Sequence, residues 1–534
     1  MARRTAFDIL RDQSRYKSIA FTRGERLLLG LQGLLPHAFA TEAQLADRAL
    51  NELRRLPRDL DRYLALSSIQ ERNEHLFYRT IVDNLEEVLP WIDTPTAAEA
   101  CREFSHIGRA PRGLFITPED KGRIAKILDN WPEKDIRIIV VTDGHRVLGL
   151  GDVGANAMGI PVGKLALYTA CAGVPPHQCL PVLLDVGTDN TALLDDPLYI
   201  GYPRRRVTGR EYLGLVNEFV RAVQKRYPSA LIQFEAFHTV DAYALLNTYR
   251  KRALCFNDDV QGTAAVVLAG IYAATRLIDR PFDELRIMFL GAGSAATGIA
   301  DLMTSALVEA GVPVEEARRR LWFVDVNGLV TQSRPDLLPH TRPYAHDHPP
   351  LGFTEAIDAI KPHVLIGATG TPGTFSQEVV ERMCAHNARP VLFALSNRAS
   401  RAECTAEQAY QWSRGRAVFV SGSPVNVVTH NGRQFRPGQG NNVYVFPGVG
   451  LGTVFCRARQ VPDAFFLTAA RTLAALVTTQ DLEQGTLYPP LRDIRSISLA
   501  IATSVAACAY QMKLARARRP RSLREAIARL MYEP

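Results

Sequence analysis

The sequence predicts an α/β protein in which helices come first and strands then alternate with helices. Three observations support this fold class. Residues 1–90 carry apolar positions at three- and four-residue spacing, which is typical of amphipathic helices. From residue 111, short apolar runs alternate with helical patterns, an order that favours a mostly parallel sheet. A glycine-rich turn at 291–298 directly follows one of these runs and opens another helical pattern.

The helical pattern of the N-terminal region runs through 27–35, 46–60 and 64–88. The stretch LPWIDTPT at 89–96 contains two prolines, which we expect to end the last of these helices. Asp93 lies just before Thr94-Pro95 in this stretch. Taken alone, Asp93 reads as a cap for a helix that begins near residue 97.

The region after residue 111 predicts a parallel sheet with functional side chains beyond its strand ends. Strands are expected at 113–117, 136–142, 180–185 and 231–234, with helices at 125–130, 158–172 and 212–226. Ligands of parallel sheets bind beyond the carboxyl ends of the strands. A lone buried lysine is commonly a structural ion-pair partner, whereas a lysine and an arginine that converge on carboxylates indicate a site. Five candidates occupy such ends or glycine-rich loops: Arg146, Lys164, Glu235, Asp258 and Asp259.

The stretch LCFNDDVQGTAAVVLAG at 254–270 places Asp258 and Asp259 side by side after an apolar run. Adjacent carboxylates are costly to hold together unless a cation or a proton separates their charges. Mg²⁺ or Mn²⁺ suits such a pair, because hard cations prefer oxygen ligands. The alternative is a helix start with Asp259 as its N-cap. A nucleotide-type turn shortly downstream favours the metal site.

A Rossmann-type dinucleotide-binding domain is predicted to start near residue 260. The apolar run at 286–290 is followed by GAGSAA at 291–296, which fits the GxGxxA form of the phosphate-binding turn. The next strand, at 321–324, ends in Asp325, where an acid that binds the ribose is expected. Further strands are expected at 363–366 and 391–395. The predicted cofactor-binding residues of the turn are Gly291, Gly293, Ser294, Ala295 and Ala296.

Composition indicates a cytoplasmic protein that acts on small molecules. Of the 534 residues, 47% are hydrophobic and 22% charged, as in soluble globular proteins. We expect no membrane span, since no apolar run reaches about 18 residues, and no secretion, since the N-terminus lacks the apolar core of a signal peptide. The eight cysteines are scattered without a CxxC pair, which indicates reduced thiols. The net charge of +8 is spread out, apart from 204–206 and 516–524, so nucleic acid is not an expected partner.

Taken together, these segments resemble the malic enzyme family over nearly the whole chain. The matching motifs are AFTxxER at 20–26, RNE at 72–74, PRGLFIT at 111–117, TDG at 142–144, LGLGD at 148–152, GIPVGKL at 159–165, DVGTDN at 185–190, FALSN at 393–397, AECTAE at 402–407 and PGQGNN at 437–442. The resemblance implies a helical N-terminal domain (1–110), a parallel-sheet substrate and metal domain (111–259 and 443–515), an inserted nucleotide domain (260–442) and a basic tail (516–534). It also implies a homodimer or homotetramer.

The resemblance further implies a reaction and the residues that carry it. The family oxidises malate at C2 with NAD or NADP and then decarboxylates the bound keto acid. Lys164 matches the base that takes the hydroxyl proton, and Arg146 matches the cation that holds a substrate carboxylate. Glu235 and Asp259 match metal ligands, with Asp258 beside them as a catalytic candidate. The residues that match the substrate–nicotinamide face are Asn397, which also counts as cofactor-binding, and Asn442.

Three positions depart from the family pattern. Asp93 stands where the family has the tyrosine that protonates the enolate, Ala236 replaces a third metal carboxylate, and Arg398 replaces a proline beside the substrate. The exchange leaves the number of acidic side chains unchanged, so we expect Asp93 to take over part of the electrostatic role at the cation. Two alternatives remain: an enzyme of the same fold that acts on a different 2-hydroxy acid, and a catalytically silent subunit that binds nucleotide.

The sequence leaves the choice of cofactor open between NAD and NADP. Asp325 at the strand end favours a free ribose 2′-hydroxyl and hence NAD. Arg342, in the following loop, lies close to where the NADP-using relatives carry a basic residue, by an approximate alignment. Asp325 therefore predicts NAD, and Arg342 keeps NADP as the alternative.

Overall fold

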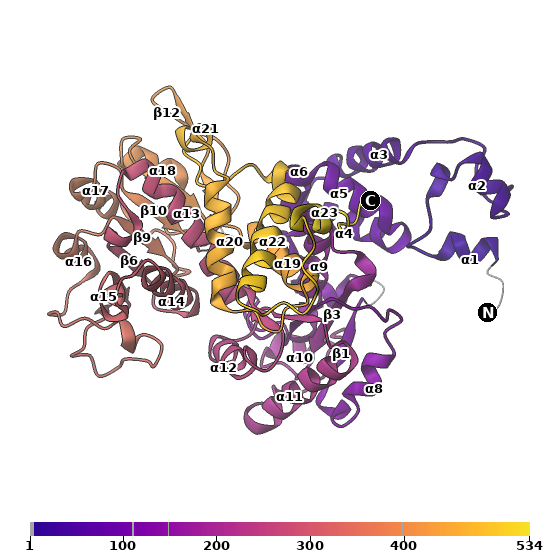
Figure 1. Ribbon diagram of the computed structural model, residues 1–534, viewed down its shortest axis with the longest axis horizontal. Coiled ribbons are helices and arrows are strands. Elements are labelled where there is room, and N and C mark those ends of the chain that lie inside the picture. Colours follow the sequence, from indigo (N-terminus) through magenta and orange to yellow (C-terminus); the bar gives the residue numbers. More distant parts are fainter. Residues whose placement is uncertain (1–4, 109–111, 148, 397–398) are drawn as a thin grey trace. The chain divides into compact units, whose positions relative to one another are not determined.

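The computed structural model describes residues 5–108, 112–147, 149–396 and 399–534 (Figure 1). The chain divides into two compact units. Unit 1 comprises Met1–Ile136, Val140–Ala222 and Leu530–Pro534, and unit 2 comprises Arg137–Ile139 and Val223–Arg529. The predicted domain boundaries at 110, 259, 442 and 515 stay predictions.

The N-terminal part of unit 1 is helical, as predicted, except that residues 29–35 form turns and irregular structure instead of the expected helix. Its helices are α1 (Ala6–Arg11), α2 (Arg23–Leu28), α3 (Glu42–Arg54), α4 (Asp59–Arg72), α5 (Glu74–Asp83), α6 (Leu85–Ile92) and α7 (Thr96–Arg102). Thr41 caps α3 with its side chain, and one face of α3 buries leucines and alanines. The two-proline stretch 89–96 ends the helix as predicted, although α6 continues two residues past Pro90, to Ile92. Proline has no backbone N–H to donate within the helix. The neighbouring side chains of Leu89, Trp91 and Ile92 are buried, and we attribute the continuation of the helix to this packing.

The next segment of the chain, most of which belongs to unit 1, alternates strands and helices. Its elements are β1 (Leu114–Ile116), α8 (Ile124–Asp129), β2 (Ile138–Thr142), the 3₁₀ segment η4 (Gly154–Met158), α9 (Gly159–Ala172), β3 (Cys179–Leu184), α10 (Thr191–Leu194) and α11 (Gly209–Arg226). Every residue of β2 and β3 is buried, and β1 pairs with β3 in parallel. These strands belong to a five-stranded sheet with the order β1-β3-β2-β4-β5. The predicted parallel sheet is confirmed.

The strands β4 (Leu231–Phe234) and β5 (Cys255–Asn257) belong to unit 2 and pair in parallel. Helix α12 (Thr239–Tyr249) connects them, and β5 leads into one turn of π-helix, η6 (Asp258–Gly262), and then into α13 (Thr263–Ile278). The continuous helical stretch Asp258–Ile278 is long and apolar enough to cross a membrane by length and composition. Most of it is buried inside the protein, as expected for a core helix.

The region of unit 2 that is predicted to bind the nucleotide contains a seven-stranded sheet with the order β14-β11-β10-β9-β6-β7-β8. The strands are β6 (Ile287–Leu290), β7 (Leu321–Asp325), β8 (Gly328–Leu329), β9 (Val364–Gly367), β10 (Val391–Ala394), β11 (Val418–Ser421) and β14 (Gly438–Gln439). Six of them run parallel, and only β8 is antiparallel to its neighbour. Helices α14 (Ser294–Glu309), α15 (Val314–Arg319), α16 (Phe353–Ile360), α17 (Gln377–His386) and α18 (Ala406–Trp412) connect them (Figure 1).

The C-terminal helices return to the core of unit 2. They are α19 (Phe446–Phe455), α20 (Asp463–Ala475), α21 (Thr479–Glu483), α22 (Ile494–Gln511) and α23 (Leu523–Ala528). Glycine allows α19 to lie close against α22, because a Cβ on Gly452 would meet the Ala502 carbonyl oxygen at 2.6 Å. The last residues belong to unit 1, where the Tyr532 N–H donates to the Gly173 carbonyl at 2.6 Å.

Candidate active site

Arg146 lies on the loop that follows β2 in unit 1. We call residues 143–147 and 149–154 the Arg146 loop, and Leu148 lies outside the described residues. Val147 and Gly151 form an isolated bridge, in which the Val147 N–H donates to the Gly151 carbonyl at 2.9 Å. Arg146 is exposed next to this bridge. The loop therefore has the ordered backbone and exposed cation that binding of an anion requires.

Lys164 and Asp93 lie on neighbouring backbone segments of unit 1. Lys164 is half-buried in the second turn of α9. Its neighbour Gly163 approaches the end of α6, where a Cβ on Gly163 would lie 3.6 Å from the Ile92 carbonyl oxygen. Asp93, the next residue, is half-buried and caps the C-terminus of α6. Unit 1 thus brings the altered acid position close to the predicted base.

The alternative reading of Asp93 as a helix N-cap is wrong. Helix α7 begins at Thr96, its N-cap is Pro95, and no side chain caps it. The Asp93 backbone carbonyl accepts a hydrogen bond from the Ala97 N–H at 3.0 Å.

The predicted acidic residues of unit 2 lie at the ends of paired strands. Phe234 and Asn257 are register partners in β4 and β5, so Glu235 and Asp258 follow at the same edge of the sheet. Both carboxyl residues are buried, and Asp259 is half-buried. The strand register explains why residues 23 positions apart in sequence come together.

Hydrogen bonds orient each of these carboxylates. Gln233 Nε2 donates to Glu235 Oε2 at 2.9 Å, and the Ala236 N–H donates to Asp259 Oδ2 at 2.7 Å. Asn442 Nδ2 donates to Asp258 Oδ2 at 2.6 Å, which connects a predicted substrate-binding residue with a predicted catalytic one. Short bonds of this kind to carboxylates restrict the side-chain rotamers.

The reading of Asp259 as a helix cap is also wrong. Asn257 caps η6, because its side chain accepts the Val260 N–H at 3.0 Å, and Gly262 at the start of α13 provides no side-chain cap. The Asp258 carboxylate lies directly over Gly262, where a Cβ would come within 1.8 Å of Oδ1. Gly262 is therefore required for this arrangement of the carboxylate.

The phosphate-binding turn has the expected local geometry. Gly291 follows β6 with φ +105°, and a Cβ there would lie 2.7 Å from the Ala368 carbonyl oxygen. Gly293 is the N-cap of α14, Ala295 is half-buried in its first turn, and Ala296 beside it is fully buried. Backbone N–H groups at such a helix start can bind phosphate.

Helix α14 also packs against the segment that carries the carboxylates. A Cβ on Gly298 would lie 2.9 Å from Val260 Cγ1, so the glycine lets α14 approach η6 closely. Tyr243 of α12 reinforces this contact with a hydroxyl–hydroxyl hydrogen bond to Thr297 at 3.1 Å. Unit 2 thus places the acidic residues beside the predicted nucleotide-binding helix.

Asp325 ends β7 as predicted, but its carboxylate is paired with Arg334. Arg334 Nη1 and Nη2 donate to Asp325 Oδ1 and Oδ2, each at 2.9 Å. Arg342 begins the 3₁₀ turn η8 (Arg342–Tyr344) and is exposed. The predicted residues Asn397 and Arg398 lie outside the described residues.

Comparison with family models decides which family the chain belongs to. Residues 70–250 match the model described as the malic enzyme N-terminal domain, and residues 260–510 match the malic enzyme NAD binding domain. The chain belongs to the malic enzyme family. The resemblance predicted from the motifs is therefore confirmed.

Similar proteins support the malic enzyme assignment along the whole chain. An NADP-dependent malic enzyme of Phaseolus vulgaris is 48% identical over 98% of this chain and 90% of its own length. One of Homo sapiens is 50% identical over 93% of this chain and 88% of its own length. In fold, the chain is similar to the malic enzyme of Pyrococcus horikoshii, with a TM-score of 0.57 and 24% identity over 84% of this chain and 89% of the other.

The residues of this malic enzyme fit a divalent metal with two protein carboxylates. Among the described residues, no group of three or more His, Cys, Asp or Glu side chains forms a metal-binding cluster. Glu235 directly precedes Ala236, whose N–H donates to Asp259, so the two acidic residues lie on adjoining backbone segments. Mg²⁺ commonly uses one or two carboxylates and fills its remaining positions with water.

Ala236 itself has a backbone conformation that is unusual for alanine. Its φ of +58° lies in the left-handed region, which Asp and Asn tolerate better than Ala. The family's aspartate would suit this backbone, so the alanine removes a carboxylate from a position whose conformation still accommodates one.

Two residues of this region were not predicted from the sequence. Arg334 was missed because it lies nine positions after the strand-end Asp325, a spacing that by itself does not indicate pairing. Glu403 is fully buried and accepts the N–H groups of Ser396 at 3.2 Å and Thr369 at 3.1 Å. It thereby connects the loops after β9 and β10, and its place in the AECTAE motif was the available signal.

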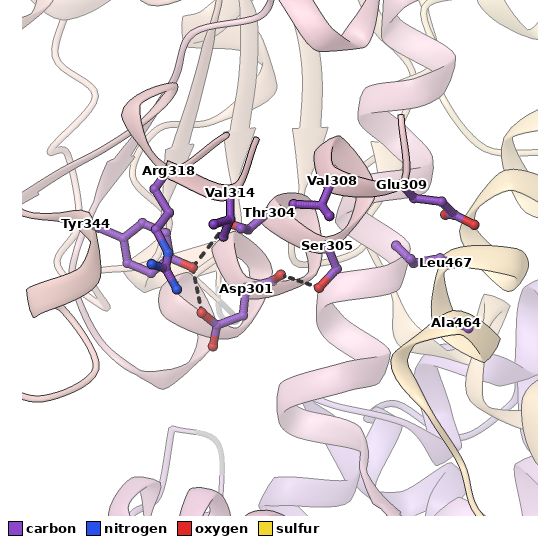
Figure 2. Close-up of a pocket in the computed structure, with 10 residues that line it drawn as sticks. All are labelled: Asp301, Thr304, Ser305, Val308, Glu309, Val314, Arg318, Tyr344, Ala464 and Leu467. Carbon is purple, nitrogen blue, oxygen red and sulfur yellow. Dashed lines mark hydrogen bonds between the residues drawn. The ribbon is translucent and has the colours of Figure 1, made fainter. Parts of the chain in front are cut away.

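A cavity of about 510 Å³ in unit 2 contains no predicted site residue. Figure 2 shows its lining, with Tyr344 directed toward Asp301 on α14 and the apolar side chains of Val308, Val314 and Leu467 nearby. The Tyr344 hydroxyl donates to Asp301 Oδ1 at 2.5 Å, so the polar groups at this end already bond to each other. We assign no part of the reaction to this cavity.

Proposed function

We propose that the chain catalyses the NADP-dependent oxidative decarboxylation of malate to pyruvate and CO₂. The observation that carries this proposal is the packing of η6 against α14 in unit 2. It places Asp258 and Asp259 beside the helix whose N-terminus suits a dinucleotide phosphate. An acid that is bound through a cation and oxidised by a nicotinamide requires this proximity. The named relatives at 48% and 50% identity carry out this type of reaction with NADP.

The side chains of unit 1 supply the base and the substrate cation in this proposal. Lys164 takes the proton of the C2 hydroxyl, and Arg146 pairs with a substrate carboxylate. Lys164 must be neutral to accept a proton, so cationic neighbours or burial must favour its uncharged form. Its half-buried position on α9 is suited to this requirement.

The side chains of unit 2 hold the metal and orient the substrate. Glu235 and Asp259 provide the carboxylates, while Asn442 contributes its amide at the substrate–nicotinamide face. A bound Mg²⁺ or Mn²⁺ would polarise the oxygen at C2 during both steps. Asp258 is fixed by Asn442, and we propose that this pair keeps the substrate face in register with the nicotinamide.

NADP is the proposed cofactor because the acid at the end of β7 is already paired. A ribose 2′-hydroxyl would need Asp325 as an acceptor, but Arg334 bonds to both of its oxygens. A 2′-phosphate instead benefits from a cation, which the exposed Arg342 provides, whereas Arg334 is paired with Asp325 and Asp336. The named relatives use NADP, which also supports this choice over NAD.

The two alternatives are less well supported. The chain is 48–50% identical to named malic enzymes over more than nine-tenths of its length. This similarity favours the malate reaction over an enzyme for another acid and over a silent nucleotide-binding subunit. A homodimer or homotetramer and a cytoplasmic location stay proposals.

A panel of 2-hydroxy acids tests the proposal against both alternatives. Purified protein with Mn²⁺ and NADP is mixed with each acid, and nicotinamide absorbance is followed. We expect malate to give the highest kcat/KM. A higher value with another acid would favour the specialised enzyme, and tight NADPH binding without turnover on any acid would favour the silent subunit.

A further inference from the structure

A buried arginine joins the two ends of the Arg146 loop. Arg206 follows β3 in sequence, and 2% of its side chain is exposed. Its Nε donates to Asp152 Oδ2 and its Nη2 to Asp152 Oδ1, each at 2.8 Å. Nη2 also donates to the Asp143 backbone carbonyl at 2.9 Å, and Nη1 lies 3.7 Å from Asp143 Oδ2. Asp143 and Asp152 are the first and tenth positions after β2, so they bracket Arg146.

The backbone of the loop closes at the same place. The Val153 N–H donates to the Gly144 carbonyl at 3.0 Å. A Cβ on Gly144, whose φ is +68°, would meet the Gly154 carbonyl oxygen at 2.2 Å. The backbone at the start of the loop therefore lies directly against the backbone at its end. Arg206 lies beside this closure and is the cation that both flanking aspartates share.

Further groups fix the aspartates on either side of Arg206. The Tyr212 hydroxyl donates to Asp143 Oδ2 at 2.9 Å, and the Asp189 N–H donates to Asp152 Oδ2 at 2.8 Å. The Gly154 N–H donates to Asp152 Oδ1 at 3.0 Å at the start of η4, which leads into α9 and Lys164. The network therefore reaches both ends of the segment between β2 and α9.

The charges favour an ionised, rigid pair. Burial acts to raise the pKa of Asp152, but hydrogen bonds and the charge of Arg206 hold it below its usual range. A guanidinium that binds a carboxylate through two parallel bonds fixes the orientation as well as the distance. Lysine cannot reproduce this geometry, since its ammonium is a point charge.

We propose that Arg206 is a positioning residue, which holds the Arg146 loop so that Arg146 meets the substrate carboxylate. The inference rests on the proposed function, in which Arg146 binds malate. Arg206 acts through the loop and does not touch the substrate. Its loss should therefore affect the binding of malate more than the binding of the nucleotide, since the phosphate-binding turn belongs to unit 2.

The test compares Arg206→Lys and Arg206→Gln with the control variant Arg205→Gln. Arg205 is the preceding residue, 61% of its side chain is exposed, and its Nη1 donates to the backbone carbonyl of the exposed Asp189 at 2.8 Å, so the control removes the same charge at the surface of the network. In the Arg206 variants we expect the malate KM to rise about tenfold or more, because small misplacements of a substrate-binding group are costly. We expect the NADP KM to change less than about twofold. Arg205→Gln should match the wild type in both.

Hydrogen–deuterium exchange provides a readout that does not depend on activity. Amides of residues 143–147 and 149–154 should exchange faster in Arg206→Lys, while those of β6 and α14 stay unchanged. Asp152→Asn should have the same effect, and the double variant should be no worse than either single one. If loop exchange and malate KM are both unchanged in Arg206→Lys and Arg206→Gln, the proposal is wrong. If loop exchange rises in the Arg206 variants but the wild type has no malate activity, the proposed function fails while the role of Arg206 in holding the loop stands.

Discussion

The backbone N–H of Ala236 donates a hydrogen bond to Oδ2 of Asp259 at 2.7 Å. This bond orients Asp259, a proposed metal ligand, and its donor Ala236 occupies the position at which the family has a further metal carboxylate. It occurs at a residue whose φ of +58° suits aspartate or asparagine better than alanine. The backbone that would carry a third carboxylate is therefore preserved.

Ala236→Asp should tighten Mn²⁺ binding. A third carboxylate adds charge and a ligand, and we expect the Kd for Mn²⁺ to fall about tenfold, because ligand charge strongly tunes such sites. Ala236→Asn is the matched control, since it suits the same backbone without the charge. Electron paramagnetic resonance of free Mn²⁺ gives both affinities. An unchanged Kd in Ala236→Asp would mean that position 236 does not face the cation.

Asp93→Asn should weaken Mn²⁺ binding if Asp93 compensates for Ala236. The expected loss is several-fold, because a carboxylate near a cation stabilises it even through water. The same titration measures it, with Asp83→Asn on the exposed end of α5 as a control. If Asp93→Asn binds Mn²⁺ as well as the wild type, the compensation hypothesis is wrong. Tighter binding by Ala236→Asp alone would then mark the site as a weakened family site.

Lys164→Ala should abolish turnover while it leaves the nucleotide bound. Loss of a general base costs roughly 10²- to 10⁴-fold in rate, and cofactor affinity does not depend on it. Turnover is measured with malate, NADP and Mn²⁺, and NADPH affinity by fluorescence titration. Retention of more than about a tenth of wild-type turnover would contradict the assignment of the base.

Arg342→Gln should weaken NADP and leave NAD nearly unaffected. Removing a cation near a 2′-phosphate should raise the NADP KM about tenfold, since charge-assisted bonds to phosphate are strong. Arg319→Gln, which removes an exposed charge at the end of α15, is the control. The measurement is kcat/KM for both nucleotides. A wild-type value clearly higher with NAD would overturn the proposed cofactor.

His363 should make the protein less stable in acid. It is buried beside β9, where Nδ1 accepts the Arg286 N–H at 2.9 Å. Burial and the charges of Arg286 and Arg280 lower its pKa from 6.5 to about 4. As the pH falls below 6.5, His363 becomes protonated in the unfolded chain but stays neutral in the folded protein. The free energy of unfolding therefore decreases until about pH 4.

His363→Asn tests this assignment because asparagine keeps an acceptor but does not titrate. Between pH 6.5 and pH 4, the variant should lose less free energy of unfolding than the wild type, by on the order of 2 kcal/mol. Urea unfolding at several pH values measures the difference, with the exposed His177→Asn as a control. Equal losses in wild type and His363→Asn would show that other groups cause the acid sensitivity.

The strands that the sequence predicted were found because their apolar runs end in recognisable turns, whereas β5, β8, β11 and β14 were not predicted. The predicted strand 231–234 coincides with β4, and the strand before the glycine-rich turn coincides with β6 within a residue. Helix boundaries were harder. Buried neighbours carried α6 past Pro90, and asparagine rather than aspartate capped η6, which local preference cannot reveal.

Pairings between distant residues could not be predicted from spacing alone. Arg334 closes on Asp325 only because β8 turns the chain back after β7, and Arg206 reaches Asp152 from the segment after β3. Such partners depend on tertiary contacts, whereas motifs report only residues that are close in sequence. The candidate site was therefore predictable in its reactive residues and not in the residues that hold them.

The most direct test of the proposed function is the stoichiometry of the malate reaction. Purified protein is incubated with malate, NADP and Mn²⁺, and NADPH and pyruvate are measured in the same samples. The account predicts equal amounts of both products, and no NADPH when malate, NADP or Mn²⁺ is omitted. NADPH with accumulation of oxaloacetate and without pyruvate, or no NADPH in a protein that binds the nucleotide, would contradict it.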